Sequence, residues 1–84
     1  MADVPTKVLD ASVIGEGIGL VSLIKQAGLV PSNGEGFRTI EQGGLLMNGE
    51  KVTDPKQTIT ADMFGEDGIL FKKGKKTFLK VKLQ

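Results

Sequence analysis

The side chains best placed for chemistry are lysines near the C-terminus, and that chemistry is the binding of a polyanion. Residues 68–84 carry six lysines and no acid, whereas residues 1–67 carry five basic and ten acidic side chains, so the two parts have net charges of +6 and −5. Such a split is typical of a chain with one end that faces a polyanion. The alternative is an edge hairpin that lysines keep from aggregating. Four of the lysines are predicted at one hairpin tip: Lys72, Lys73, Lys75 and Lys76.

Catalytic chemistry has little to build on. The sequence contains no histidine and no cysteine, which removes the commonest general base and the thiolate metal sites. The acids are scattered without an evident pair, so we predict no catalytic residue, no metal ligand and no cofactor for this chain. The run Gly15-x-Gly17-x-Gly19 matches neither phosphate-loop pattern in full, and Glu16 would repel a phosphate. A flexible entry into a helix is the preferred interpretation.

The stretch from Gly28 to Val52 holds the strongest local signals. Ser32 and Glu35 have the spacing of a capping box, which predicts a helix over residues 33–42. The pair Gly43-Gly44 ends that helix. A strand over residues 45–47 then leads into Asn48-Gly49, which suits a two-residue hairpin turn with positive φ at both positions, and Val52 lies on the return strand.

A second helix is predicted over residues 20–27. Its apolar side chains recur at helical spacing and make one core stripe, namely Leu20, Leu23, Ile24 and Ala27. In helix 33–42, Gly36 and Ile40 share the face that packs on this stripe. Arg38 lies on the other face, where it can pair with Glu35 or Glu41 or make a bidentate contact with a phosphate or a base.

Phe37 lies between the two faces of helix 33–42. We expect it to complete the core, with a stacking surface for an unpaired base as the alternative. The remaining core is predicted from Ile59, Met63 and Phe64.

Strands are predicted over residues 6–10, 69–71 and 77–83. In the last one, Leu79, Val81 and Leu83 alternate with Phe78, Lys80 and Lys82. The fold class is therefore α+β, with two short helices packed on a small, mostly antiparallel sheet with hairpins. One domain spans residues 1–84, of which 1–4 are a linker remnant and 68–84 a basic hairpin. No apolar run is long enough for a membrane span, and no signal peptide is recognisable.

The pattern Ser-x-x-Glu-x-x-Arg-x-Ile, then Gly-Gly, then Asn-Gly-x-x-Val, resembles the RNA-binding domain named after small-subunit ribosomal protein S-four, an alpha-L RNA-binding motif, here over residues 18–52. The resemblance is closer to the version at the C-terminus of bacterial tyrosyl-tRNA synthetases. Three stretches carry it: GLVSLIKQAGLVPS, IEQGG…NGEKVTDP and ILFKKGKKTFLKVKL. The chain departs from the usual Glu-Ala-Arg-Arg at Gly36 and Phe37, and Asn33 stands where a basic residue is frequent.

The resemblance implies a cytoplasmic, non-enzymatic fragment that binds the tRNA for tyrosine at its variable arm and anticodon stem. ATP, magnesium and dimerisation would belong to a catalytic part outside this sequence, so the fragment is expected to be a monomer that binds neither DNA nor membrane. The implied RNA contacts combine the hairpin lysines with the helix and the turn after it: Ser32, Asn33, Arg38, Gln42, Asn48, Lys51, Lys72, Lys73, Lys75 and Lys76. A free-standing domain of the same type on ribosomal RNA and a protein-interaction module are the alternatives. A DNA-binding helix-turn-helix is disfavoured by the two glycines in helix 33–42.

Overall fold

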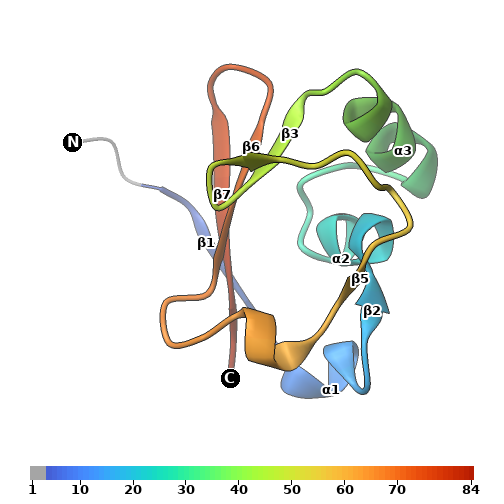
Figure 1. Cartoon of the computed structure of the whole chain (residues 1–84). Coiled ribbons are helices and arrows are strands. Elements are labelled where there is room, and N and C mark those ends of the chain that lie inside the picture. The colour runs from blue at the N-terminus through green and yellow to red at the C-terminus, as the bar shows by residue number, and fades with distance from the viewer. Residues whose placement is uncertain (1–3) are drawn as a thin grey trace.

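The chain alternates short helices and short strands (Figure 1). The structure, a computed structural model, describes residues 4–84, so most of the predicted linker remnant at residues 1–4 lies outside it. The elements in chain order are β1 (Thr6–Leu9), α1 (Ala11–Ile14), β2 (Ile18–Gly19), α2 (Leu20–Gln26), α3 (Asn33–Glu41), β3 (Leu45–Met47), β4 (Glu50–Lys51), β5 (Thr58–Ile59), the 3₁₀ helix η1 (Ala61–Met63), β6 (Ile69–Lys73) and β7 (Thr77–Leu83).

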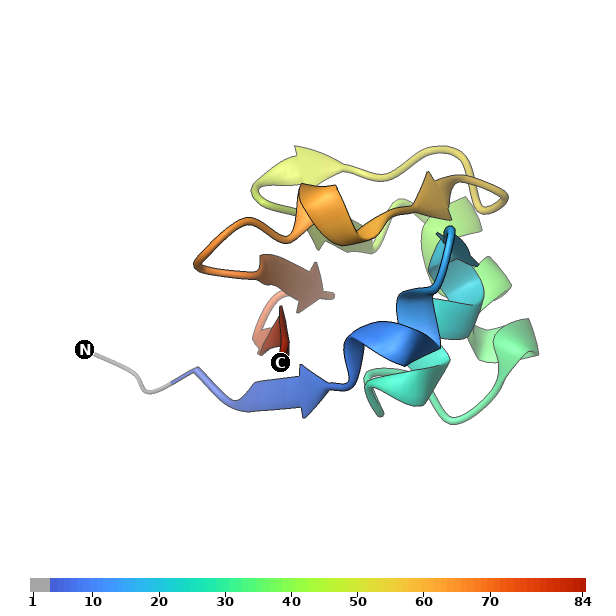
Figure 2. The ribbon, with the colours of Figure 1, turned by 90° about the horizontal axis from the view of Figure 1, so that it is seen from below.

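Five of the strands form one sheet in the order β1-β7-β6-β3-β4, and β2 pairs with β5 in a separate ribbon. The pairing is antiparallel except between β1 and β7, which run parallel. Figures 1 and 2 place α2 and α3 together on one side of the five-stranded sheet. The predicted α+β class with a mostly antiparallel sheet is confirmed.

The core lies between that sheet and the two helices. The predicted stripe of α2 is confirmed, because Leu20, Leu23, Ile24 and Ala27 are all buried. The sheet contributes alternate residues of its inner face, including Leu45, Phe71 and Val81, which are fully enclosed. The alternation predicted for residues 77–83 is therefore confirmed at its centre.

The contact between α2 and α3 depends on a glycine. Gly36 is buried, and a Cβ atom built on it would lie 2.9 Å from Cγ1 of Val21 and 3.5 Å from Cδ1 of Ile24. Ile40, one turn further along α3, is also buried. The face predicted to pack on helix 20–27 is thus the face that does so, and the missing side chain is what lets the two helices approach closely.

The glycines of the run at residues 15–19 are exposed, and only Gly17 among them lies close to another element. Gly15 follows the last turn of α1 with φ 54°, and Gly19 is the N-cap of α2. A Cβ on Gly17 would lie 2.8 Å from Cγ2 of Thr58, because β2 pairs with β5 along this stretch. The run therefore serves as the helix entry that the sequence favours, with an added ribbon pairing.

Helix α1 is an element that the sequence analysis does not predict. Its N-cap is Asp10, whose Oδ1 accepts a hydrogen bond from the Ser12 backbone N–H at 3.0 Å. Hydrogen bonds from the backbone and side chain of Ser12 hold the pKa of the Asp10 carboxyl below its ordinary value of 3.8. With only four residues, α1 depends on this cap and on its one buried side chain, Ile14.

The residues after Pro55 give one correction. Ile59 and Phe64 are buried as predicted, but Met63 is exposed. It lies in η1, where its sulfur accepts a hydrogen bond from the Thr60 backbone N–H at 3.4 Å. The thioether therefore covers the start of this short helix instead of entering the core.

Candidate nucleic-acid interface

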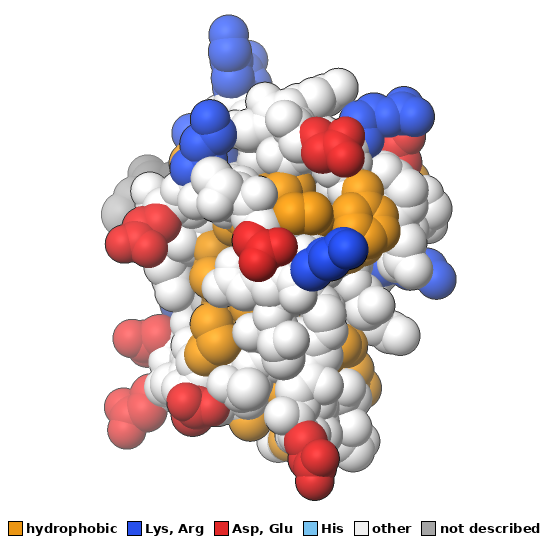
Figure 3. Space-filling view, turned by 45° about the vertical axis from the view of Figure 1, so that its right-hand side comes forward, with side chains coloured by type: hydrophobic (Ala, Val, Ile, Leu, Met, Phe, Trp, Pro, Cys, Tyr) orange, Lys and Arg blue, Asp and Glu red, His pale blue; other side chains and the backbone are white. Residues whose placement is uncertain are grey.

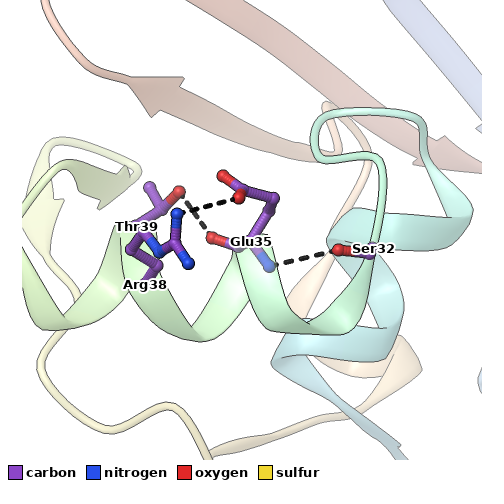
Figure 4. Close-up of polar contacts among 4 residues, drawn as sticks. All are labelled: Ser32, Glu35, Arg38 and Thr39. Atoms are coloured by element: carbon purple, nitrogen blue, oxygen red, sulfur yellow. Dashed lines mark hydrogen bonds and ion pairs between the residues drawn. The ribbon is translucent and has the colours of Figure 1, made fainter.

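The start of α3 is held by half of the predicted capping box (Figure 4). Ser32 is the N-cap, and its Oγ accepts a hydrogen bond from the Glu35 backbone N–H at 3.3 Å. The reciprocal half is not formed: the Glu35 carboxylate turns along the helix, and its Oε1 lies 3.3 Å from Nη1 of Arg38. Of the two ion pairs open to Arg38, the one with Glu35 is therefore formed, and it takes the carboxylate that the capping box would have used.

Arg38 remains open to solvent despite that pair. Its side chain is 67% exposed, and an exposed ion pair of this kind contributes only about 0–1 kcal/mol. The guanidinium can therefore exchange Glu35 for a phosphate at little cost. Asn33 and Gln42 at the two ends of the helix are exposed as well.

The expectation that Phe37 completes the core is wrong, because its side chain is 39% exposed. The physical reason is the geometry of the helix pair. Successive residues of an α-helix point about 100° apart, and α3 meets α2 through Gly36 and Ile40. The next position along the chain is then turned out of the contact.

The four lysines predicted at the hairpin tip have different surroundings. Strand β6 extends to Lys73, so only Lys75 and Lys76 lie in the turn, where both are exposed. The Lys73 Nζ donates a hydrogen bond to the Leu29 carbonyl at 3.0 Å. The Lys72 Nζ lies 5.3 Å from the ring centroid of Phe78. The prediction that all four lysines lie at the hairpin tip is therefore wrong for Lys72 and Lys73, which belong to β6.

A backbone contact joins the hairpin to the end of α3. The Gly74 N–H in the β6–β7 turn donates to the Gly44 carbonyl at 2.8 Å. The exposed lysines of the turn are thus fixed beside the segment that follows Gln42. The strand register adds a second link, because β3 begins at Leu45 and pairs with β6 at Lys73.

Lys51 and Asn48, the other predicted contacts, have structural partners. The Lys51 Nζ lies so close to Gly43 that a Cβ there would be 2.8 Å from it, and a cation beside a helix C-terminus is stabilised by the helix dipole. Asn48 has φ 53° and Gly49 φ 86°, which confirms the predicted turn. Oδ1 of Asn48 also accepts a hydrogen bond from the Leu70 N–H at 3.0 Å. Val52, just beyond β4, is buried.

The charges are separated over the surface. In Figure 3 the lysine and arginine side chains lie mainly over the upper and middle parts of the molecule, where a few acidic side chains also occur, and the charged side chains of the lower part are mostly acidic. Over the described residues 4–84, no group of three or more acidic side chains gathers in a way that could hold a metal ion. Within the same range, no helix combines the length and apolar character that crossing a membrane requires.

Comparison with known proteins decides the family. The family model "Tyrosine--tRNA ligase SYY-like C-terminal domain" matches residues 1–81. The chain belongs to this family. The tyrosine–tRNA ligase of Clostridium botulinum (strain Eklund 17B / Type B) is 39% identical to it over 84 residues, covering 100% of this chain and 20% of that protein. The resemblance stated from the sequence is thereby confirmed.

Other family members show the same extent of similarity. The ligase of Clostridium tetani is 37% identical over 84 residues, again 100% of this chain and 20% of the relative. That of Acetivibrio thermocellus is 38% identical over 81 residues, 96% of this chain and 20% of the relative. The chain therefore spans about a fifth of the length of the curated relatives it matches, as a member of the SYY-like C-terminal domain family.

Proposed function

We propose that this domain binds the tRNA for tyrosine, at the variable arm and the anticodon stem, and holds it for a catalytic part that lies outside this sequence. Family membership supports the choice of tRNA, because the relatives are named as tyrosine–tRNA ligases. The observation that carries the proposal is the Gly74–Gly44 hydrogen bond, which fixes the exposed turn lysines beside the end of α3. Two kinds of RNA-binding group thus share one end of the molecule.

The two groups have different tasks in this proposal. Lys75 and Lys76 contact backbone phosphates, since a flexible ammonium group meets a phosphate without reading the base. Arg38 releases Glu35 and makes a bidentate contact with a phosphate or a base edge. Asn33, Gln42 and the Ser32 end of α3 line the same exposed helix. A smaller contribution comes from three residues that already have contacts within the domain, namely Asn48, Lys51 and Lys72.

The domain itself carries out no reaction. Activation of tyrosine, with ATP and magnesium, belongs to the catalytic part, which also supplies dimerisation, so this domain acts as a cofactor-free monomer in the cytoplasm. We assign it no role in binding DNA or membranes. Its contribution is to raise the local concentration of the tRNA and to orient it.

Titration of the 84-residue chain tests the proposal. The tRNA for tyrosine and a tRNA with a short variable arm are each titrated at several salt concentrations. We expect tighter binding of the first, with an affinity that falls linearly with the logarithm of salt concentration. Equal affinity for both tRNAs, or a preference for a ribosomal RNA fragment over either, would contradict it. If no RNA binds while a protein is captured, the interaction-module alternative takes its place.

A further inference from the structure

The five-stranded sheet has an outer face of which the tRNA proposal uses only Lys51 and Lys72, in a minor role. The core takes Phe71 and Val81, so the alternate positions of the paired strands point the other way. The register places nine residues on this outer face: Thr6 and Val8 of β1, Phe78, Lys80 and Lys82 of β7, Leu70 and Lys72 of β6, Leu46 of β3 and Lys51 of β4. In Figures 1 and 2, α2 and α3 lie on the opposite side of the sheet.

The charged side chains that the register places on the outer face are all lysines. Four of the nine residues are lysines and none is acidic, but the Lys51 ammonium turns to Gly43 at the end of α3, so Lys72, Lys80 and Lys82 supply the charge of the face. In the pairing of β6 with β7, Lys80 lies opposite Leu70. Two residues further along β6, Lys72 lies opposite Phe78. Lys80 and Lys82 are two residues apart on one strand, a separation of about 6.8 Å. An edge that needs only protection from aggregation does not require lysines in the middle of the sheet, and β6 and β7 are both interior strands.

Phe78 adds an aromatic ring to this charge. It is 38% exposed, and the Lys72 ammonium lies 5.3 Å from its ring centroid. An exposed ring on a sheet, bordered by cations, combines the two parts of a single-strand binding surface, which are a stacking platform for a base and positive charge for the backbone. The sequence signal for this arrangement is the alternation of Phe78, Lys80 and Lys82 on one side of β7.

We propose that this outer sheet face is a second RNA-binding surface, specific for unpaired nucleotides, on which Phe78 stacks with a base while Lys72, Lys80 and Lys82 contact phosphates. The inference rests on the proposed function only in taking RNA as the polyanion. It shares Lys72 with the tRNA interface proposed above, and its other residues differ from the main contacts proposed there, namely Arg38, Lys75 and Lys76. A tRNA with unpaired nucleotides can therefore engage both surfaces.

The test uses the 84-residue chain with short single-stranded polyuridine and polyadenosine as probes, followed by fluorescence anisotropy. Phe78→Leu keeps an apolar side chain and removes the π-face, and should weaken binding at least about fivefold. Phe78→Tyr should retain it. The matched control is Phe37→Leu, since the two rings are exposed to nearly the same extent, 39% and 38%. Thermal unfolding of each variant shows that the fold persists.

The lysines are tested by salt dependence. Lys80→Gln combined with Lys82→Gln should make the slope of log affinity against log salt shallower by about 0.7 for each phosphate that is no longer neutralised. The matched control is Lys25→Gln combined with Lys56→Gln, which removes the same charge from exposed positions outside the face. The slope of this control should stay steeper than that of the variant changed at Lys80 and Lys82.

The outcomes separate this inference from the proposed function. Selective tRNA binding combined with oligonucleotide binding that ignores Phe78 overturns the second surface alone. Phe78-dependent oligonucleotide binding without tRNA selectivity supports it and overturns the proposed function. A loss caused by Phe37→Leu but not by Phe78→Leu moves the stacking site to α3 and overturns the inference. Equal competition by polyglutamate or by duplex RNA overturns the specificity for unpaired bases.

Discussion

Gly36 is the single residue that sets how closely the two main helices pack. The Cβ that alanine adds would lie 2.9 Å from Cγ1 of Val21, a β-branched side chain with little freedom to move aside. Gly34, two residues earlier, is exposed, and its added Cβ would meet only the Ser32 hydroxyl at 3.8 Å. Both glycines of α3 weaken the helix, but only Gly36 has a role in packing.

We expect Gly36→Ala and Gly34→Ala to change stability in opposite directions. Gly34→Ala should stabilise the fold by up to about 1 kcal/mol through helix propensity. In Gly36→Ala the same gain is offset by overpacking of about 1–3 kcal/mol, so the net effect should be destabilising by up to about 2 kcal/mol. Urea denaturation of both variants measures this. Similar midpoints for the two would mean that α2 moves away without cost.

Asp10 should make the stability of the fold depend on pH in the acid range. Its folded pKa lies below the ordinary 3.8, so its contribution is fully present above that value and is lost as the pH falls through the folded pKa. Asp10→Asn keeps a capping side chain but cannot titrate. The difference in unfolding temperature between wild type and variant should shrink or change sign below pH 3.8. Parallel pH profiles for the two proteins would contradict the assignment.

At the scale of elements, the β6–β7 hairpin combines a structural lysine with exposed ones. Lys73 is half-buried and bound to the Leu29 carbonyl in the segment between α2 and α3. Lys75 and Lys76 have no such bond within the described residues. The same side-chain type therefore has different consequences at positions two or three residues apart.

Lys73→Met should destabilise the fold by about 1–2 kcal/mol, because it leaves the Leu29 carbonyl without its donor. It should change the salt slope of RNA binding little. Lys75→Ala combined with Lys76→Ala should do the reverse, leaving stability near wild type and making the slope shallower by about 0.7–0.9 per phosphate contact. Chemical denaturation and tRNA titration on the same samples compare them. A shallower slope in Lys73→Met alone would assign the phosphate contact to Lys73.

How well elements could be predicted from sequence depends on how local their stabilising contacts are. Helix α3, the Asn48-Gly49 turn and strand β7 carry their own signals, in the cap, the turn chemistry and the alternation, and all three are confirmed. The two-residue strands β2 and β5 are defined only by their pairing with each other. Neither segment has a local sequence pattern that predicts this pairing. The parallel contact of β1 with β7 joins residues more than seventy positions apart, which no local pattern encodes.

The candidate site shows the same limit. Exposure of Arg38 follows from its place opposite Gly36 and Ile40, so periodicity finds it. The different surroundings of Lys72 and Lys73 follow from which face of β6 each occupies and from where the loop after α2 passes. The positions of the lysines in the sequence reveal neither the strand face that each occupies nor the path of the loop after α2.

At the scale of the whole molecule, the separated charges and Arg38 should contribute differently to RNA binding. Removing a lysine that contacts a phosphate should weaken the binding of all RNAs by similar factors. An arginine that reads a base through a bidentate contact contributes about 1–3 kcal/mol of discrimination between RNAs. Arg38→Ala should therefore bring the affinities for the cognate and a non-cognate tRNA closer together. The measurement is the ratio of the two dissociation constants. An unchanged ratio would leave Arg38 as a helix-surface ion pair with Glu35.

The position of β7 between β1 and β6 also governs how this domain comes to be folded. The strand synthesised last among the described residues occupies the interior of the sheet, and its neighbour β1 is the one synthesised first. Pairing two strands so distant in sequence costs the conformational entropy of the long loop between them. This cost precedes the favourable free energy of the contact, which slows folding. On the ribosome, β1 therefore has no partner, and the sheet stays incomplete, until residues 77–83 have left the exit tunnel. The β6–β7 hairpin, the β1–β7 pair and the outer face they share therefore form only after β7 has been synthesised.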